Sequence, residues 1–65
     1  MEIGKVLRQL REERDVSIKE LADELGISSS HISQIERGIS SPSITMLKKL
    51  SNVLDVPITY FFEQD

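Results

Sequence analysis

Four short polar side chains lie at helical spacing near the middle of the chain: Ser29, Ser30, Ser33 and Gln34. They share one face of a predicted helix in which Ile32 and Ile35 point the other way, towards a core. A serine hydroxyl can hydrogen-bond to any base, whereas the amide of Gln34 can make two hydrogen bonds to the edge of adenine. The spacing therefore predicts a short, exposed polar face, nearly free of acids, whose groups are able to hydrogen-bond to base edges.

The other reactive side chains give little support to catalytic or metal chemistry. His31 is the only histidine and the chain has no cysteine. The sequence offers neither a nucleophile with a base and an orienting group nor a set of spaced metal ligands. We therefore expect no enzymatic activity, no metal and no cofactor, and we expect His31 to be a surface residue near a DNA phosphate.

The distribution of charge matters more than its sum. A formal net charge of -3 argues against a nucleic-acid partner. Between residues 27 and 49, however, the chain holds a single acid, Glu36, and three cations: Arg37, Lys48 and Lys49. Arg37 either contacts a phosphate or complements the dipole at the end of its helix, and both interpretations stay open. A locally basic face can thus coexist with an acidic remainder.

Length and composition limit the architecture. With 65 residues and no cysteine, the chain is expected to form one domain over residues 1–65, with a small core made by helix packing. No apolar run reaches the length of a membrane span, and the N-terminus lacks the residue order of a secretory signal. We therefore expect a soluble, cytoplasmic protein.

Apolar periodicity and capping residues at the start of the chain predict two helices. Apolar residues at i, i+3, i+4 and i+7 predict a first helix over residues 3–14. A capping box that joins Ser17 to Glu20 begins a second helix at residues 18–25, which Gly26 ends in a left-handed conformation.

Similar signals continue towards the C-terminus. Ser28 is the predicted cap of a third helix over residues 29–37, and Ser43 that of a fourth helix, which ends at Asp55. Because aspartate adopts the left-handed conformation less readily than glycine, we expect this last end to fray or to finish differently. A short helix at residues 58–62 follows.

Arg11 lies on the apolar face of the first predicted helix. A buried arginine needs a carboxylate partner, since an unpaired buried charge is very costly. The sequence therefore predicts an ion pair between Arg11 and an acid on another element.

Six segments form a specific combination: residues 10–14 (Leu-Arg-Glu-Glu-Arg), 17–22, 25–27, 32–38, 42–43 and 54–58. Together they make the chain resemble, over nearly its whole length, the Cro/C1 lambda-repressor-like family of DNA-binding domains, also called the XRE family. The resemblance implies a compact, all-α fold of five helices, in which the second and third form a helix-turn-helix. It also implies that residues 29–37 form the recognition helix and that the four polar positions named above read the bases.

The resemblance assigns further roles to single residues. It implies that phosphates are bound at the start of the second helix by Lys19 and near the start of the fourth by Ser41 and Ser43. Free N–H groups and the positive end of the helix dipole suit an anion at such helix starts. Glu36 matches a position whose carboxylate pairs with an arginine at the position of Arg11 in similar domains. We therefore predict that Arg11 and Glu36 pair and orient the recognition helix.

Apolar residues crowd the predicted C-terminal helix: Ile58, Tyr60, Phe61 and Phe62. They cannot all face one core. By resemblance, Ile58 and Phe61 are expected to form a two-fold dimer interface. Such a homodimer would place two recognition helices about 34 Å apart on a palindromic operator.

The chain departs from the family pattern at three positions. Ile18 stands where many relatives have a glutamine that contacts phosphate, and Asp15 and Asp55 stand where glycine is usual. We expect these differences to change one contact and two helix ends while the fold is kept.

Two functions follow from this interpretation. The first is a sequence-specific transcriptional regulator, a bacterial or phage repressor associated with the nucleoid, which binds double-stranded DNA. The second keeps the fold but binds a protein, as an antitoxin-like or antirepressor module. Either function allows a protein partner or an effector domain that follows Asp65.

Overall fold

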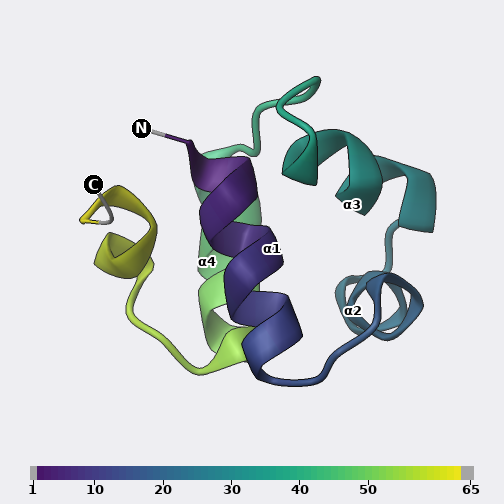
Figure 1. Cartoon of the computed structure of the whole chain (residues 1–65), viewed down its shortest axis with the longest axis horizontal. Helices are drawn as coiled ribbons and strands as arrows, with labels where there is room; N and C mark the ends of the chain where they lie inside the picture. The colour runs from purple at the N-terminus through teal and green to yellow at the C-terminus, as the bar shows by residue number, and fades with distance from the viewer. Residues whose placement is uncertain (1, 64–65) are drawn as a thin grey trace.

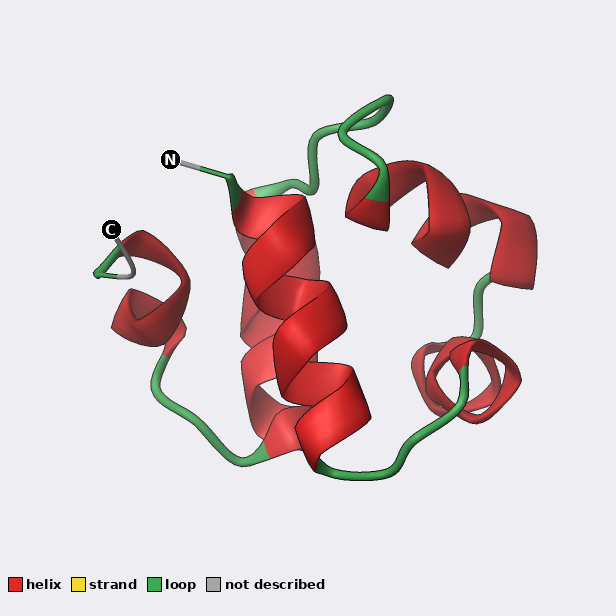
Figure 2. Ribbon diagram, in the orientation of Figure 1, coloured by secondary structure: helices red, strands yellow, loops and turns green. Residues whose placement is uncertain are grey.

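The computed structural model describes residues 2–63, so that Met1, Gln64 and Asp65 lie outside it. Five elements follow one another along the chain: α1 (Ile3–Glu13), α2 (Ile18–Leu25), α3 (Ser29–Glu36), α4 (Ile44–Leu54) and the 3-10 helix η1 (Ile58–Phe62) (Figure 1). Within residues 2–63 there is no strand (Figure 2). None of the helices in this range has the length and apolar character needed to cross a membrane.

The helices pack around one small core. In Figure 1, α2 and α3 lie on one side of α1, and η1 lies on the other. α3 packs against α1 and α2, α2 also packs against α4, and η1 packs against α1 and α4. The core consists of twelve buried apolar side chains: Val6, Leu7, Leu10, Leu21, Ala22, Leu25, Ile32, Ile35, Leu47, Leu50, Leu54 and Phe61. Every element contributes to this core, so the placement of α3 depends on the whole domain.

Side-chain caps begin three helices as the sequence predicts. The Ser17 hydroxyl accepts a hydrogen bond from the backbone N–H of Glu20 at 3.0 Å, and the Glu20 carboxylate accepts one from the backbone N–H of Ser17 at 2.9 Å. Ser28 and Ser43 cap α3 and α4 through single bonds of 3.1 Å. Gly26 ends α2 at φ 70°, a conformation that glycine adopts without steric cost. The capping predictions are therefore confirmed.

Two helix ends and the C-terminal element differ from the prediction. α1 ends at Glu13 and α3 at Glu36, because Arg14 and Arg37 are the C-cap residues, each outside its helix. The C-terminal element is a 3-10 helix, which is common in runs this short. The fold over residues 2–63 therefore has four α-helices and a 3-10 helix in place of five α-helices.

The expectation that α4 would fray or finish differently at Asp55 is wrong. Asp55 has φ 58° and ψ 49°, a left-handed cap, and Asp15 has φ 57°. The residue after each aspartate donates its backbone N–H back into the preceding helix, Val16 to Arg11 and Val56 to Ser51, both at 3.0 Å. Both valines also pack against the core. A hydrophobic contact of this kind stabilises a left-handed helix end, so aspartate is held in the conformation that glycine usually adopts.

Candidate nucleic-acid interface

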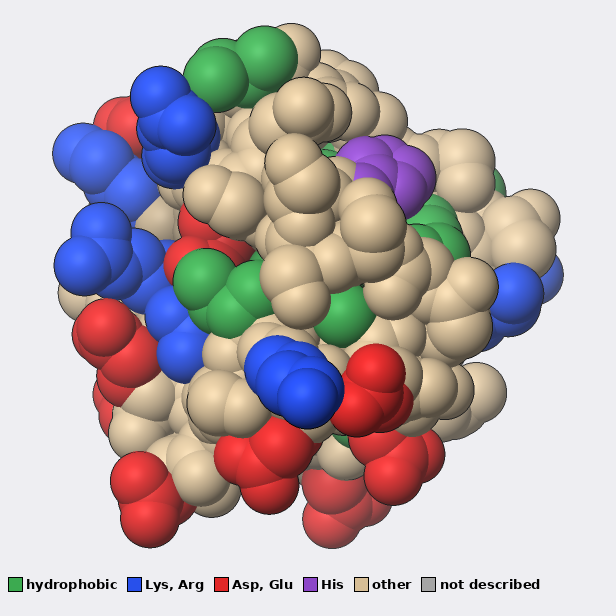
Figure 3. All heavy atoms as spheres, turned by 90° about the vertical axis from the view of Figure 1, so that its right-hand side faces the viewer, with side chains coloured by type: hydrophobic (Ala, Val, Ile, Leu, Met, Phe, Trp, Pro, Cys, Tyr) green, Lys and Arg blue, Asp and Glu red, His purple; other side chains and the backbone are tan. Residues whose placement is uncertain are grey.

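The outer face of α3 is polar and free of acidic side chains. Ser29, Ser30 and Gln34 are exposed and Ser33 is half-buried, whereas Ile32 and Ile35 are 0% and 1% exposed. The four predicted base-reading residues therefore share one accessible surface. Figure 3 shows a broad area without acidic side chains on the side of the molecule that α2 and α3 occupy, with a histidine and a few hydrophobic side chains in it. Acidic side chains gather below this area, and basic ones lie mostly along its left edge, with others at its lower centre and right.

The residues predicted to contact phosphate fall into two groups on either side of α3. Lys19 is exposed in the first turn of α2. Arg37, Ser41 and Ser43 are exposed beyond the C-terminal end of α3, in or beside the loop that rises above α3 in Figure 1. The Ser43 hydroxyl accepts a bond from Met46, which leaves its own hydrogen available to a phosphate oxygen.

His31 and Ile18 lie close to these groups in the chain but differ in their surroundings. His31 is half-buried in the first turn of α3. Ile18 is partly buried against the core, so its side chain contributes to packing. A phosphate at the start of α2 would therefore meet the free N–H groups of the helix and the Lys19 ammonium.

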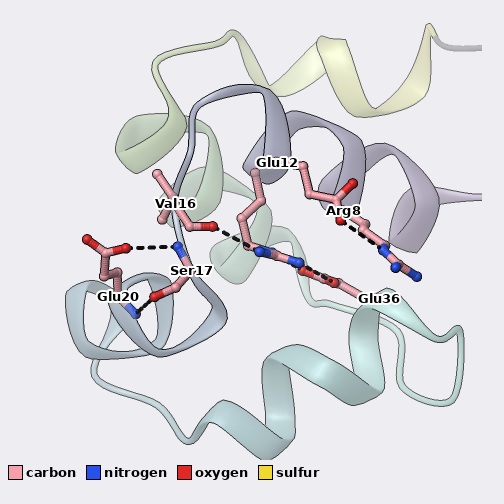
Figure 4. A network of polar contacts seen from close by, with 7 residues as sticks. Arg8, Glu12, Val16, Ser17, Glu20 and Glu36 are labelled. Carbon is pink, nitrogen blue, oxygen red and sulfur yellow. Dashed lines mark hydrogen bonds and ion pairs between the residues drawn. The ribbon is translucent and has the colours of Figure 1, made fainter.

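An ion pair joins α1 to the end of α3 (Figure 4). Arg11 Nε lies 2.7 Å from Glu36 Oε2, and a second guanidinium nitrogen lies 3.2 Å from Oε1. The third guanidinium nitrogen donates to the carbonyl of Val16 at 2.9 Å. The two side chains are only 11% and 6% exposed. The hydrogen bond to Glu36 raises the pKa of Arg11 above its ordinary value, so the guanidinium stays charged.

Sequence comparison identifies the family. The helix-turn-helix family model HTH_3 matches residues 7–61. The chain belongs to this family. The resemblance to Cro/C1-type (XRE) domains is thereby confirmed.

A curated member of this family is similar over almost the whole chain. The HTH-type transcriptional regulator SlrR of Bacillus subtilis (strain 168) is 42% identical over 64 residues, which cover 97% of this chain and 42% of SlrR. The chain spans about half the length of the curated relatives that it matches.

Two solved structures that contain the SinR protein have the same fold. The structure of SinR, the master regulator for biofilm formation, in complex with DNA aligns with a TM-score of 0.86 and 40% identity, over 94% of this chain and 98% of that one. A complex of the SinR and SinI proteins aligns with a TM-score of 0.86 and 40% identity, over 95% of this chain and 61% of that one. The predicted all-helical helix-turn-helix architecture is confirmed at this level.

The predicted dimer contact at Phe61 is wrong. Phe61 is 0% exposed and belongs to the core, so its side chain is not available to a second copy. In a 3-10 helix residues i and i+3 lie on the same face. Ile58 and Phe61 therefore share the inward face, and Ile58 is half-buried against the core. The exposed aromatic residue of η1 is Phe62, at 41%.

The sequence did not predict one residue that packs against the end of α3. Gly4 lies in the first turn of α1, against the backbone of Ile35 and Glu36. An isolated glycine within a helical pattern often has a packing reason, and that was the available signal. The element that Gly4 approaches could not be known without the structure.

Among residues 2–63, no group of three or more His, Asp or Glu side chains could hold a metal ion. The candidate site therefore consists of hydrogen-bonding groups and a few cations around α3. Such a surface can bind a polar, anionic ligand through hydrogen bonds and charge.

Proposed function

We propose that this protein is a sequence-specific DNA-binding transcriptional regulator that acts as a repressor and places α3 in the major groove. The observation that carries the proposal is the similarity, at 40% identity over 94% of the chain, to SinR in complex with DNA. The polar outer face of α3 supports it. We propose four base-reading residues: Ser29, Ser30, Ser33 and Gln34.

The proposed phosphate contacts flank this helix. Lys19 and the start of α2 bind one strand, and Arg37, Ser41 and Ser43 bind the other, while His31 lies near a phosphate beside the bases. Regulation by DNA binding needs no cofactor and no catalytic step. We propose that residues 1–65 act as one domain for this purpose, in the cytoplasm of a bacterium.

Binding to DNA at different salt concentrations tests the proposal. Lys19 and Arg37 are two cations per protomer, so the logarithm of the affinity for bulk duplex should fall with the logarithm of salt at a slope of about -2 per protomer. Selection of binding sites from random duplex DNA should then enrich one sequence. If the protein does not bind duplex DNA at low ionic strength, the proposal is wrong.

We further propose a homodimer on a palindromic operator, with η1 at its interface. The partly exposed Ile58 and the exposed Phe62 are the apolar groups that η1 offers to a second copy. Phe62→Ser should shift the protein towards monomer in sedimentation equilibrium, and should weaken binding to a two-half-site operator more than binding to a single half-site. Val53→Ser is the matched control, since Val53 is also exposed, at 37%, but lies on α4. A wild-type protein that stays monomeric at high concentration, with and without operator, would exclude the dimer.

The alternative function is binding to a protein. SinR, of which this chain matches a part, forms a complex with the SinI protein, and this supports the alternative. The net charge of -3 suits a basic partner. The salt titration separates the two functions, because a module that only binds protein should have negligible affinity for duplex DNA.

A further inference from the structure

Gly4 allows α1 to approach the backbone of α3 unusually closely. A Cβ atom at Gly4 would lie 2.7 Å from the carbonyl oxygen and 2.9 Å from the carbonyl carbon of Glu36, and closer still to the carbonyl oxygen of Ile35. These are backbone atoms, so no side-chain rotation could relieve the contact. A larger residue would require the two helices to separate.

Gly4 and Arg11 act on the same end of α3. They lie about two turns apart on α1, which places them on one face of that helix. Gly4 meets the main chain of Glu36, and Arg11 binds its carboxylate. The last residue of α3 is therefore fixed at its backbone and at its side chain. The long side chain of Arg11 could follow a small movement of α3, whereas the backbone contact at Gly4 could not.

The end of α3 also anchors the loop that follows it. The carbonyl of Gln34 accepts hydrogen bonds from the backbone N–H groups of Ile39 and Ser40, at 2.9 and 3.2 Å. The carbonyl of Ile35, which Gly4 faces, accepts one from Gly38 at 3.1 Å. A shift of this turn would therefore move Gln34 and the loop together.

We propose that Gly4 is a positioning residue that sets the last turn of α3 relative to the rest of the DNA-binding surface, and thereby the selectivity for DNA sequence. The inference rests on the proposed function. Gly4 itself touches no DNA. It acts through the backbone of Ile35 and Glu36, on which the direction of Gln34 depends.

The test is Gly4→Ala in an Asp55→Gly background. Glycine at the left-handed end of α4 relieves the strain of aspartate there and should offset part of the lost stability. The measured quantity is the ratio of the Kd for random duplex to the Kd for the selected operator, at one salt concentration. We expect this ratio to fall about tenfold, comparable to one mismatched base pair. The amide resonances of Ile39 and Ser40 should shift in the free protein.

Leu54→Val in the same background is the matched control. Leu54 is buried near the end of α4, which packs against α2 and η1. Its shortening should lower stability without changing the ratio. The proposal is overturned if the ratio for Gly4→Ala stays within about twofold of that of its parent, or if the control lowers the ratio as much. It is also overturned if Gly4→Ala does not fold, because a positioning residue must leave the fold intact. Failure of the parent to bind DNA would instead reject the proposed function.

Discussion

The two faces of α3 are fixed by different means. The inner face is held by burial of Ile32 and Ile35, by the backbone contact with Gly4, and by the ion pair between Glu36 and Arg11. The outer face carries serines and a glutamine. Within residues 2–63, their side chains make no hydrogen bond to another helix. One face therefore places the helix, and the other is left available to a ligand.

This difference separates what stabilises the domain from what would select its ligand. Substitutions on the inner face should change the free energy of unfolding, because they remove packing or leave a charge without its partner. Substitutions on the outer face should change ligand selectivity and leave stability nearly unchanged.

The largest effect is expected from Arg11→Ala. It leaves the Glu36 carboxylate, which is 6% exposed, without its partner, and breaking one side of a buried pair costs about 3 to 5 kcal/mol. Urea unfolding followed by circular dichroism measures the loss.

Arg8→Ala is the matched control on the same helix. Arg8 pairs with Glu12 at 3.4 Å, but these side chains are 65% and 55% exposed. An exposed pair contributes about 0.5 kcal/mol. Equal urea midpoints for the Arg11→Ala and Arg8→Ala variants would mean that the buried pair does not hold α3.

Gln34→Ala should have the second largest effect, on selectivity. Loss of a bidentate base contact costs about 1 to 3 kcal/mol of discrimination, so the preference for the selected operator should fall about tenfold or more. The urea midpoint should stay near that of the wild type, because Gln34 is exposed. Gln9→Ala, an exposed glutamine on α1, should change neither quantity. An unchanged operator preference would show that Gln34 does not read a base.

The sequence predicts the inner face better than the outer one for a physical reason. Burial imposes helical periodicity, and the caps at Ser17, Ser28 and Ser43 stand directly before the helices that they begin, so both features are local. The approach of Gly4 to α3 and the burial of Phe61 depend on how distant segments meet, and local patterns do not encode that. Phe62 rather than Phe61 is exposed because η1 packs against α1 and α4 with Phe61 in the core.

The sequence predicts the accessibility of the outer-face residues but not the ligand that they bind. Their accessibility follows from the helical wheel, which the structure matches. Their partner is not encoded in their spacing, since serine and glutamine side chains serve equally well as solvated surface. The similarity to SinR in complex with DNA supports a role for this face in binding bases, and the Gln34→Ala experiment tests that role.

The smallest effect is expected at the capping box that begins α2, next to the proposed phosphate contact of Lys19. The backbone N–H and the hydroxyl of Ser17 lower the pKa of Glu20 from its ordinary value of 4.5. A carboxyl group whose pKa is lower in the folded state stabilises that state above its unfolded pKa, and this contribution disappears as the pH falls through the lower, folded value. Glu20→Gln keeps an acceptor for the Ser17 N–H but cannot titrate. The stability advantage of the wild type over this variant should therefore be constant above about pH 5 and shrink towards pH 3, in urea midpoints measured across that range. Glu24→Gln, on the same helix but outside the capping box, is the control, and an equal pH dependence for the two variants would contradict the assignment.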